Sequence, residues 1–260
     1  MKTDHNLTRR TLLSSGLAAT ALLPLKAALA RADACTLIPE QELGPYYIPD
    51  ELVRSDIREG KLGIPLDLRV HVLDINTCRP LVGAAVDLWH CDADGVYSGF
   101  DHVSTLPPPE PPPAGALPAS APPVQQPTDR LTFLRGIQLT DHHGLTRFRT
   151  ILPGCYPGRT NHIHFKVRLA GALAGRTYRG GHVSHAGQIF FPEEIVAPLM
   201  RADPYALHQV ERTPQAEDSV YTRQNGRAST VSMQPVLGGS RGFGAWLMAA
   251  VDPNGHADPA

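Results

Sequence analysis

Several segments of the chain alternate apolar and polar residues with a period of two, the pattern of a strand with one buried face. The clearest is LDLRVHV at 66–72, where four aliphatic residues alternate with aspartate, arginine and histidine. The same reasoning predicts further strands at 84–90, in the two halves of 135–154 around a turn at 141–144, at 162–169 and at 242–251.

Helix signals are scarce in this chain. FPEEIVAPLM at 191–200 predicts one short helix, with a proline near its start and two glutamates in the first turn. Residues 107–127 contain ten prolines, and strand patterning resumes after them, so they predict an exposed loop inserted into the domain. We therefore expect an all-β fold over 31–260, a single β-sandwich of mainly antiparallel strands with long loops and little helix.

The first 30 residues have the pattern of a removable export signal. Arg9 and Arg10 precede an uncharged run, and Ala28-Leu29-Ala30 offers a cleavage site. The setting TRRTLL is typical of a twin-arginine signal, which predicts an exported protein in the periplasm or outside the cell. The alternative is an ordinary secretory signal in which the arginine pair is incidental.

Charge and motifs exclude several classes of protein. Cleavage of the leader would remove four basic residues and one acidic residue, which changes the formal charge from -1 to -4. This leaves no basic patch for nucleic acid or a membrane surface, so we expect neither as a partner. The sequence contains no dinucleotide fingerprint, phosphate loop or GxSxG motif.

Four cysteines follow the leader, and none forms a C-x-x-C pair, which argues against a zinc ribbon. An oxidising compartment permits disulfides, and three complete pairings are possible. We favour Cys35 with Cys78, because this bond would tie the start of the mature chain to the first strand pair.

Candidate chemistry is concentrated in GCYPGRTNHIHF at 154–165. On a strand, His162 and His164 point to the same face, where they could bind a metal or simply contact water. Arg159 beside two neutral imidazoles suits an anionic ligand, whereas Tyr156 could equally be a turn aromatic at the edge of the core. The residues alone leave the metal site and the solvated strand both open.

Three stretches in a fixed order carry a family resemblance: WHCDADGVYSGF, FLRGIQLTDHHGLTRFRTILPGCYPGRTNHIHFKV and GQIFFPEE. Together they resemble the intradiol aromatic-ring dioxygenases from about residue 44 to residue 194. The resemblance implies a mononuclear, non-haem Fe(III) ion held by two tyrosinates and two histidines, which here are Tyr97, Tyr156, His162 and His164. It also implies that Tyr156 leaves the metal and helps to deprotonate the substrate, that Arg159 stabilises negative charge on it, and that Gln188 lies near the active site.

The donor types agree with the implied metal. Phenolate oxygens are hard anionic donors that favour Fe(III), whereas zinc sites use cysteine, histidine and carboxylate. No acidic residue lies between Asp141 and Glu193, which argues against a two-histidine, one-carboxylate Fe(II) site.

The expected function is cleavage of a catechol-type ring between its two hydroxyl-bearing carbons by O2, giving a cis,cis-muconate-type diacid. The partners are a small aromatic ortho-diol and O2, with a homo-oligomer left open. Two alternatives remain: an exported β-sandwich binding module with a vestigial metal site, and a zinc-dependent hydrolase that uses the HIH pair.

Other conspicuous residues have structural interpretations. We expect Trp89 to pack in the sandwich core. Cys155 stands where the family often has a bulky residue, which leaves the size of the substrate open. The remaining prominent histidines are expected in loops or on the surface; they are His90, His142, His143, His182 and His185.

Overall fold

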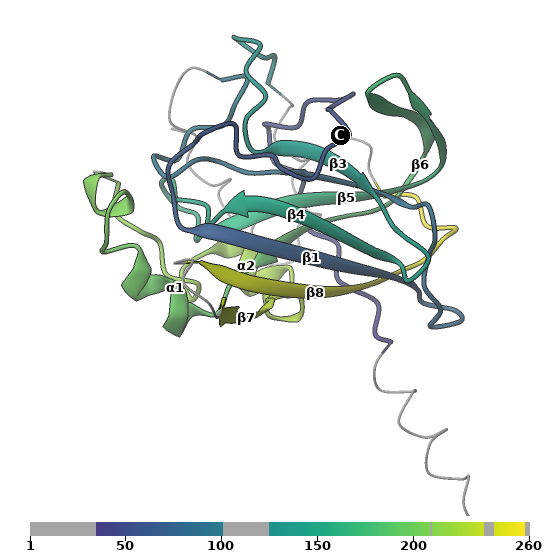
Figure 1. Cartoon of the computed structure of the whole chain (residues 1–260). Helices are drawn as coiled ribbons and strands as arrows, with labels where there is room; N and C mark the ends of the chain where they lie inside the picture. Colours follow the sequence, from purple (N-terminus) through teal and green to yellow (C-terminus); the bar gives the residue numbers. More distant parts are fainter. Residues whose placement is uncertain (1–34, 101–124, 209, 237–241, 258–260) are drawn as a thin grey trace, which may run out of the picture. The chain divides into compact units, whose positions relative to one another are not determined.

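Two four-stranded sheets form the computed structural model, which describes residues 35–100, 125–208, 210–236 and 242–257 (Figure 1). The first sheet has the order β4-β1-β8-β7, with β1 at Pro65–Asp74, β4 at Leu145–Ile151, β7 at Ser232–Pro235 and β8 at Phe243–Val251. The second has the order β3-β2-β5-β6, with β2 at Ala85–Trp89, β3 at Arg135–Leu139, β5 at His162–Ala174 and β6 at Thr177–Phe190. All neighbouring strands are antiparallel except β1 and β8, which confirms the predicted sandwich.

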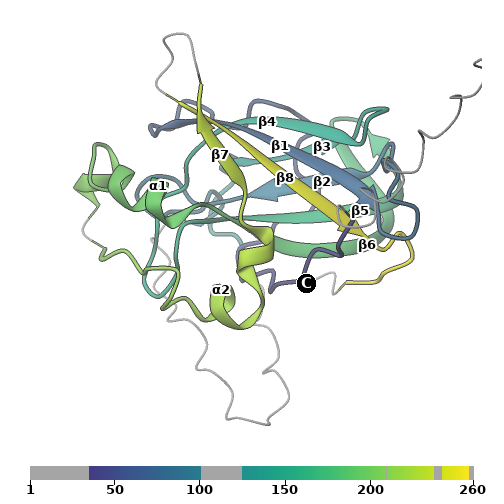
Figure 2. The same cartoon turned by 90° about the horizontal axis from the view of Figure 1, so that it is seen from below.

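The helices gather at one end of the sandwich, beside β7 (Figures 1 and 2). They are α1 at Glu193–Leu199 and α2 at Ser219–Arg223, with short 3-10 turns at Tyr205–Leu207 and Gly226–Ser229. The position of α1 confirms the helix expected at 191–200, and the pattern gave no indication of α2. Among the described residues, no helix has the length and apolar character needed to cross a membrane.

The core lies between the two sheets. Its residues on β1 are Leu66, Leu68, Val70 and Val72, each at most 2% exposed, as the alternation predicts. Their counterparts on the second sheet include Val86 and Leu88 of β2 and Ile163, Phe165 and Val167 of β5.

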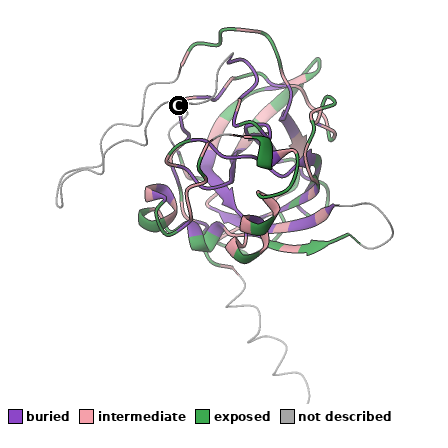
Figure 3. Cartoon of the chain, turned by 90° about the vertical axis from the view of Figure 1, so that its left-hand side faces the viewer, coloured by how far each residue is buried: buried purple, intermediate pink, exposed green. Residues whose placement is uncertain are grey.

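The second sheet is also buried on the face that points away from this core. All five residues of β2 are buried, as are the first six of β5, although only alternate positions face the first sheet. The chain before β1 lies against this sheet: Gln41 N donates to Ala186 O, and Ile137 N donates to Leu52 O. Figure 3 shows the buried positions, in purple, extending from the strands into neighbouring loop segments.

The disulfide between Cys35 and Cys78 is present, as favoured from the sequence, and Cys91 and Cys155 are free and buried. The leader at 1–30 and residues 107–124 of the proline-rich insert lie outside the described residues.

The expectation of loop or surface positions fails for His185, which is buried on a strand, and holds only in part for His90, which lies in the loop after β2 but is buried. His90 is fully buried, and its ring nitrogens lie 2.7 Å from Cys91 O and 2.7 Å from Thr150 Oγ1, which ties the end of β2 to β4 of the other sheet. His185 is 1% exposed on β6. By contrast, His142 and His143 are exposed in the turn before β4, as expected.

Candidate active site

The predicted metal ligands come together on the outward face of the second sheet. His162 and His164 share that face of β5, as the strand geometry requires. Tyr156 Oη lies 3.0 Å from His162 Nε2, which lies 3.1 Å from His164 Nε2. The Tyr97 ring centroid is 5.9 Å from that of Tyr156 and 6.2 Å from that of His164. All four side chains are buried, none more than 5% exposed, so the solvated-strand interpretation is wrong.

A tight turn presents Tyr156. Its carbonyl accepts from Arg159 N at 3.1 Å, and Gly158 has φ of 79°, the left-handed conformation that favours glycine. Proline at the second position and glycine at the third are the residues that a type II turn requires. The sequence Tyr156-Pro157-Gly158-Arg159 therefore specifies how the tyrosine enters the site.

The loop that carries Tyr97 is fastened to the loop that carries Tyr156. Asp92 Oδ1 accepts from Val96 N at 2.9 Å, and Asp92 O accepts from Gly154 N at 3.1 Å. A Cβ on Gly95 would lie 2.5 Å from Cys155 O, so a larger residue would push the two loops apart. The two tyrosines, 59 positions apart in sequence, are thus held as one unit.

Both histidines are neutral, and His162 presents a lone pair to this site. Burial, with the charge of Arg159 adding to it, lowers the pKa of His162 well below its usual value, and burial does the same for His164. His162 Nδ1 lies 2.7 Å from Thr160 O and donates its proton there, because a carbonyl can only accept. Nε2 of His162 therefore carries the lone pair that faces Tyr156 and His164.

The tyrosines need a cation to ionise. Burial raises the pKa of Tyr97 and of Tyr156, so both phenols are neutral in the protein alone. The buried Tyr97 hydroxyl makes no hydrogen bond within the described part of the chain. A trivalent cation held by these four side chains would satisfy that oxygen and favour both phenolates, so the residues fit Fe(III). Over the same residues, no group of three or more His, Cys, Asp and Glu side chains could hold a metal, as a zinc site of common type would require.

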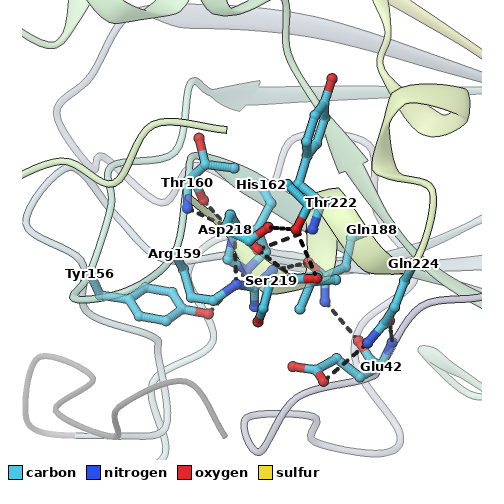
Figure 4. A network of polar contacts seen from close by, with 12 residues as sticks. Glu42, Tyr156, Arg159, Thr160, His162, Gln188, Asp218, Ser219, Thr222 and Gln224 are labelled. Atoms are coloured by element: carbon cyan, nitrogen blue, oxygen red, sulfur yellow. Dashed lines mark hydrogen bonds and ion pairs between the residues drawn. The ribbon is translucent and has the colours of Figure 1, made fainter. Parts of the chain in front are cut away.

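Arg159 and Gln188 lie beside the ligands in a connected polar network (Figure 4). Arg159, 4% exposed, donates from Nε to Asp218 Oδ2 at 3.0 Å and from Nη2 to Gln188 Oε1. Gln188 Nε2 in turn donates to Glu42 O at 2.8 Å. Burial opposes the charge on Arg159, but the neighbouring Tyr156 and Asp218 raise its pKa above the usual value, so it is a permanent cation. Arg159 and Gln188, which the resemblance implied separately, thus contact each other beside the proposed ligands.

Aromatic rings from the N-terminal segment and from β2 pack against the proposed ligands Tyr97 and His164. The Tyr46 ring stacks on Tyr97 with centroids 4.7 Å apart, and Trp89 stacks on His164 at 5.2 Å and 8°. The expectation that Trp89 packs in the sandwich core is wrong, because odd positions of β2 face outward and even positions face the core. Gly44, in the N-terminal segment, lies directly against His164, since a Cβ at this glycine would be 3.1 Å from His164 Cε1.

Sequence reasoning missed Asp218, the ionic partner of Arg159. It lies 59 residues after the arginine, at the N-cap of α2, in a region without strand or helix periodicity. The one local signal is an aspartate followed by a short run that can form a helical turn, which is an N-cap pattern.

The fold and these residues define a β-sandwich with a buried site of two tyrosines and two histidines. No family sequence model matches the chain. A curated relative, the chlorocatechol 1,2-dioxygenase of Pseudomonas putida, is 28% identical over 154 residues, which cover 49% of this chain and 47% of the relative. The match therefore spans about half the length of that relative.

Solved structures extend the comparison. An intradiol ring-cleavage dioxygenase from Tetranychus urticae aligns with a TM-score of 0.70 and 33% identity, over 86% of this chain and 98% of that chain. The catechol 1,2-dioxygenase of Pseudomonas arvilla C-1 shares the fold, with a TM-score of 0.54 and 22% identity over 89% of this chain and 69% of that chain. The chain belongs to the intradiol ring-cleavage dioxygenases, a family of ring-cleaving enzymes, which confirms the resemblance seen in the sequence.

Proposed function

We propose that the protein is an Fe(III)-dependent intradiol dioxygenase that acts on a catechol-type aromatic ortho-diol. The reaction adds both atoms of O2 to the diol and breaks the bond between its hydroxyl-bearing carbons, giving a cis,cis-muconate-type diacid. The observation that carries the proposal is the buried convergence of two phenol oxygens and two neutral imidazoles in a member of this family.

The residues that would hold the metal are Tyr97, Tyr156, His162 and His164. When bound, Fe(III) supplies the Lewis acidity and the electron-accepting character that make the ring of a coordinated diol reactive towards O2. Tyr97 and the two histidines lie on or against the sheet, where their packing restricts movement.

Tyr156 and Arg159 have the chemical properties for the remaining tasks. Because burial raises the pKa of Tyr156, this phenol takes up a proton readily once a metal no longer holds it, and the diol can supply that proton. Arg159 is a buried permanent cation on the same turn, suited to stabilise negative charge that develops on the substrate. Gln188 accepts from the guanidinium and fixes its direction.

Colour and oxygen uptake test the proposal together. Iron-loaded protein should be red-brown from tyrosinate-to-iron charge transfer, and it should consume one O2 per diol with release of a muconate-type product. Tyr97→Phe should bleach the colour, whereas Tyr178→Phe, a buried tyrosine elsewhere on the same sheet, should retain it. Protein that remains colourless and consumes no oxygen after iron loading would refute the proposal. An extradiol product would refute the site of cleavage.

We further propose export through the twin-arginine route, from the motif TRRTLL at 8–13. Replacing Arg9 and Arg10 by lysine should retain the precursor in the cytoplasm. Undiminished mature protein in the periplasm or the medium would favour the ordinary secretory route.

A further inference from the structure

We infer that Asp218 is the positioning residue of this site, fixing both the guanidinium of Arg159 and the imidazole of His162 through the backbone of Thr160. The expected effect on turnover rests on the proposed function, whereas the positioning of the two side chains rests on the geometry alone.

Asp218 is fully buried, and both of its oxygens are used. Oδ1 accepts from the backbone N–H groups of Val220 at 2.8 Å and Tyr221 at 3.1 Å, which caps α2. Oδ2 accepts from Arg159 Nε at 3.0 Å and from Thr160 N at 2.9 Å. A carboxylate offers about four lone-pair positions, so this one is saturated, with one oxygen for the helix and one for the site.

The bond to Thr160 extends the effect to a proposed metal ligand. Thr160 donates its N–H to Asp218, and its own carbonyl accepts the proton of His162 Nδ1 at 2.7 Å. That second bond keeps the proton on Nδ1 and the lone pair on Nε2, and it sets the rotation of the ring. One carboxylate thus acts on the charge-stabilising arginine and, one residue further, on the tautomer of a histidine.

A second acidic residue holds the other side of the same segment. Arg212 donates to both carboxylate oxygens of Glu193, at 2.6 Å each, and to Asn161 Oδ1 at 2.7 Å. Asn161 Nδ2 then donates to Pro153 O at 3.0 Å, in the strand exit that leads to Tyr156. Thr160 and Asn161 therefore connect the site to the helical end of the sandwich, with α2 acting through Asp218 and α1 through Arg212.

Asp218 differs from Glu193 in reach. Its Oδ2 atom contacts Arg159 and the Thr160 backbone directly, whereas Glu193 reaches Thr160 only through Arg212, whose Nη2 donates to Thr160 Oγ1 at 3.2 Å. Burial also makes the link to Arg159 hard to replace, because removing the carboxylate leaves a buried cation without its ionic partner. The geometry therefore identifies Asp218 as the residue whose loss misplaces the arginine and releases the imidazole.

Asp218→Ser tests this with little change to the helix, since serine is also a good N-cap but is too short to reach Arg159. We expect kcat and kcat/KM for a catechol to fall together by ~10²-fold with little change in KM, as for a misplaced catalytic group. The matched control is Thr222→Val, which removes a hydroxyl that donates to Asp218 O at 2.8 Å but leaves the carboxylate in place. It should keep both constants within twofold.

Nuclear magnetic resonance of the metal-free protein gives a readout independent of turnover. In the wild type, the His162 Nδ1–H and Arg159 Nε–H protons should be protected from exchange, and in Asp218→Ser both signals should be lost. Thr222→Val should retain them.

The inference is wrong if Asp218→Ser retains kcat within twofold or loses no more than Thr222→Val. It is equally wrong if the wild-type, metal-free protein lacks the two protected protons, a measurement that needs no variant to fold. A wild type that oxidises no diol would refute the proposed function while the resonance experiment still decides the role of Asp218.

Discussion

On β1 the residues that face away from the core are Asp67, Arg69 and His71, and all three are exposed or half-buried. On β5 the corresponding residues include His162, His164 and Lys166, and none is more than 2% exposed. Both strands alternate apolar and polar residues, so their sequence patterns predict the same half-buried strand. The difference lies in what covers the outward face.

Segments without regular structure cover the second sheet. Val53 N donates to Arg176 O at 2.8 Å and Arg54 N donates to Ile137 O at 3.0 Å, so the N-terminal segment is fastened along β3 and the β5–β6 turn. Within the described part of the chain, residues 67–71 of the first sheet are less covered: Asp67, Arg69 and His71 are exposed or half-buried, although His71 Nε2 is itself buried without a hydrogen-bond partner. A polar residue under cover must find a partner or a ligand, since burying it unpaired costs about 1–3 kcal/mol.

The covered face meets this requirement incompletely. Its buried polar atoms that find no hydrogen-bond partner among the described residues include Asp87 Oδ1, Trp89 Nε1, Arg135 Nη1, His164 Nδ1 and Arg168 Nε. Such groups are costly for stability and typical of functional sites. The two outward faces therefore differ in function. The face of the first sheet is largely in contact with solvent, whereas the face of the second sheet is buried and can form a functional site.

The largest difference between the two faces is expected when one histidine is removed from each in separate variants. His162→Ala should abolish the iron colour and weaken iron binding by more than the ~100-fold that outer-shell changes typically cost. His71→Ala, on the outward face of β1, should leave colour and turnover unchanged. Metal analysis after gel filtration measures both variants. Equal iron content in the two would show that the covered histidine is not a ligand.

The next effect concerns the covering segment itself, through the buried carboxyl of Glu51. Burial raises its pKa from 4.5 to about 7, with Arg135 at 3.8 Å acting in the opposite direction. The folded state thus disfavours the ionised form, and stability is lost as the pH rises from about 4.5 to about 7. At ~1.4 kcal/mol per pKa unit, the full penalty is about 3 kcal/mol.

Glu51→Gln should therefore gain stability over the wild type as the pH rises through this window, with the gain levelling off above pH ~7. Urea unfolding at a series of pH values measures the difference. Glu194→Gln, on an exposed position of α1, controls for the loss of one carboxylate. A stability difference that does not change between pH 4.5 and 7 would contradict the assignment.

A smaller effect is expected from a pair of glycines with similar backbone conformation. Gly44 has φ of 69° and lies over His164, whereas Gly60 has φ of 77°, and a Cβ there would meet no described atom within 4 Å. Alanine should cost each site about 1–2 kcal/mol of stability from left-handed strain. Only Gly44→Ala should also shift the charge-transfer band, because its Cβ presses on the imidazole. Identical spectra for the two variants would show that the segment around Gly44 does not contact His164 closely enough to affect the iron site.

The features of this molecule that local sequence patterns encode could be predicted. The alternation in β1 and β5 predicted the strands and their faces, and Tyr156 was considered as a turn residue, which agrees with the turn that the structure forms at Pro157-Gly158. The resemblance then supplied Tyr97, which no local pattern joins to His162. The strand predictions succeeded because each depends on a few adjacent residues, whereas the assignment of Tyr97 as a metal ligand stays a prediction.

The segment that covers the second sheet and the residue that supports Arg159 could not be predicted from the sequence, for a physical reason. The segment from 38 to 57 has no periodicity, and its hydrogen bonds go to strand edges far along the chain. Asp218 caps a helix of five residues, too short to leave a periodic signal, and its second function depends on tertiary contact with Arg159. Trp89 was misplaced for the same reason, since an aromatic on a strand predicts burial without telling which face is covered.

The smallest effect is expected on the open face, from the ion pair between Asp67 and Arg147. The arginine side chain is 60% exposed and the aspartate 24%. Water and salt screen such a pair, and holding two flexible side chains together costs entropy, so Asp67→Asn should change the free energy of unfolding by less than about 1 kcal/mol. Iron colour and turnover should not change. A loss of several kcal/mol would mean that this face is not simply solvated, and the contrast between the two sheets would have to be abandoned.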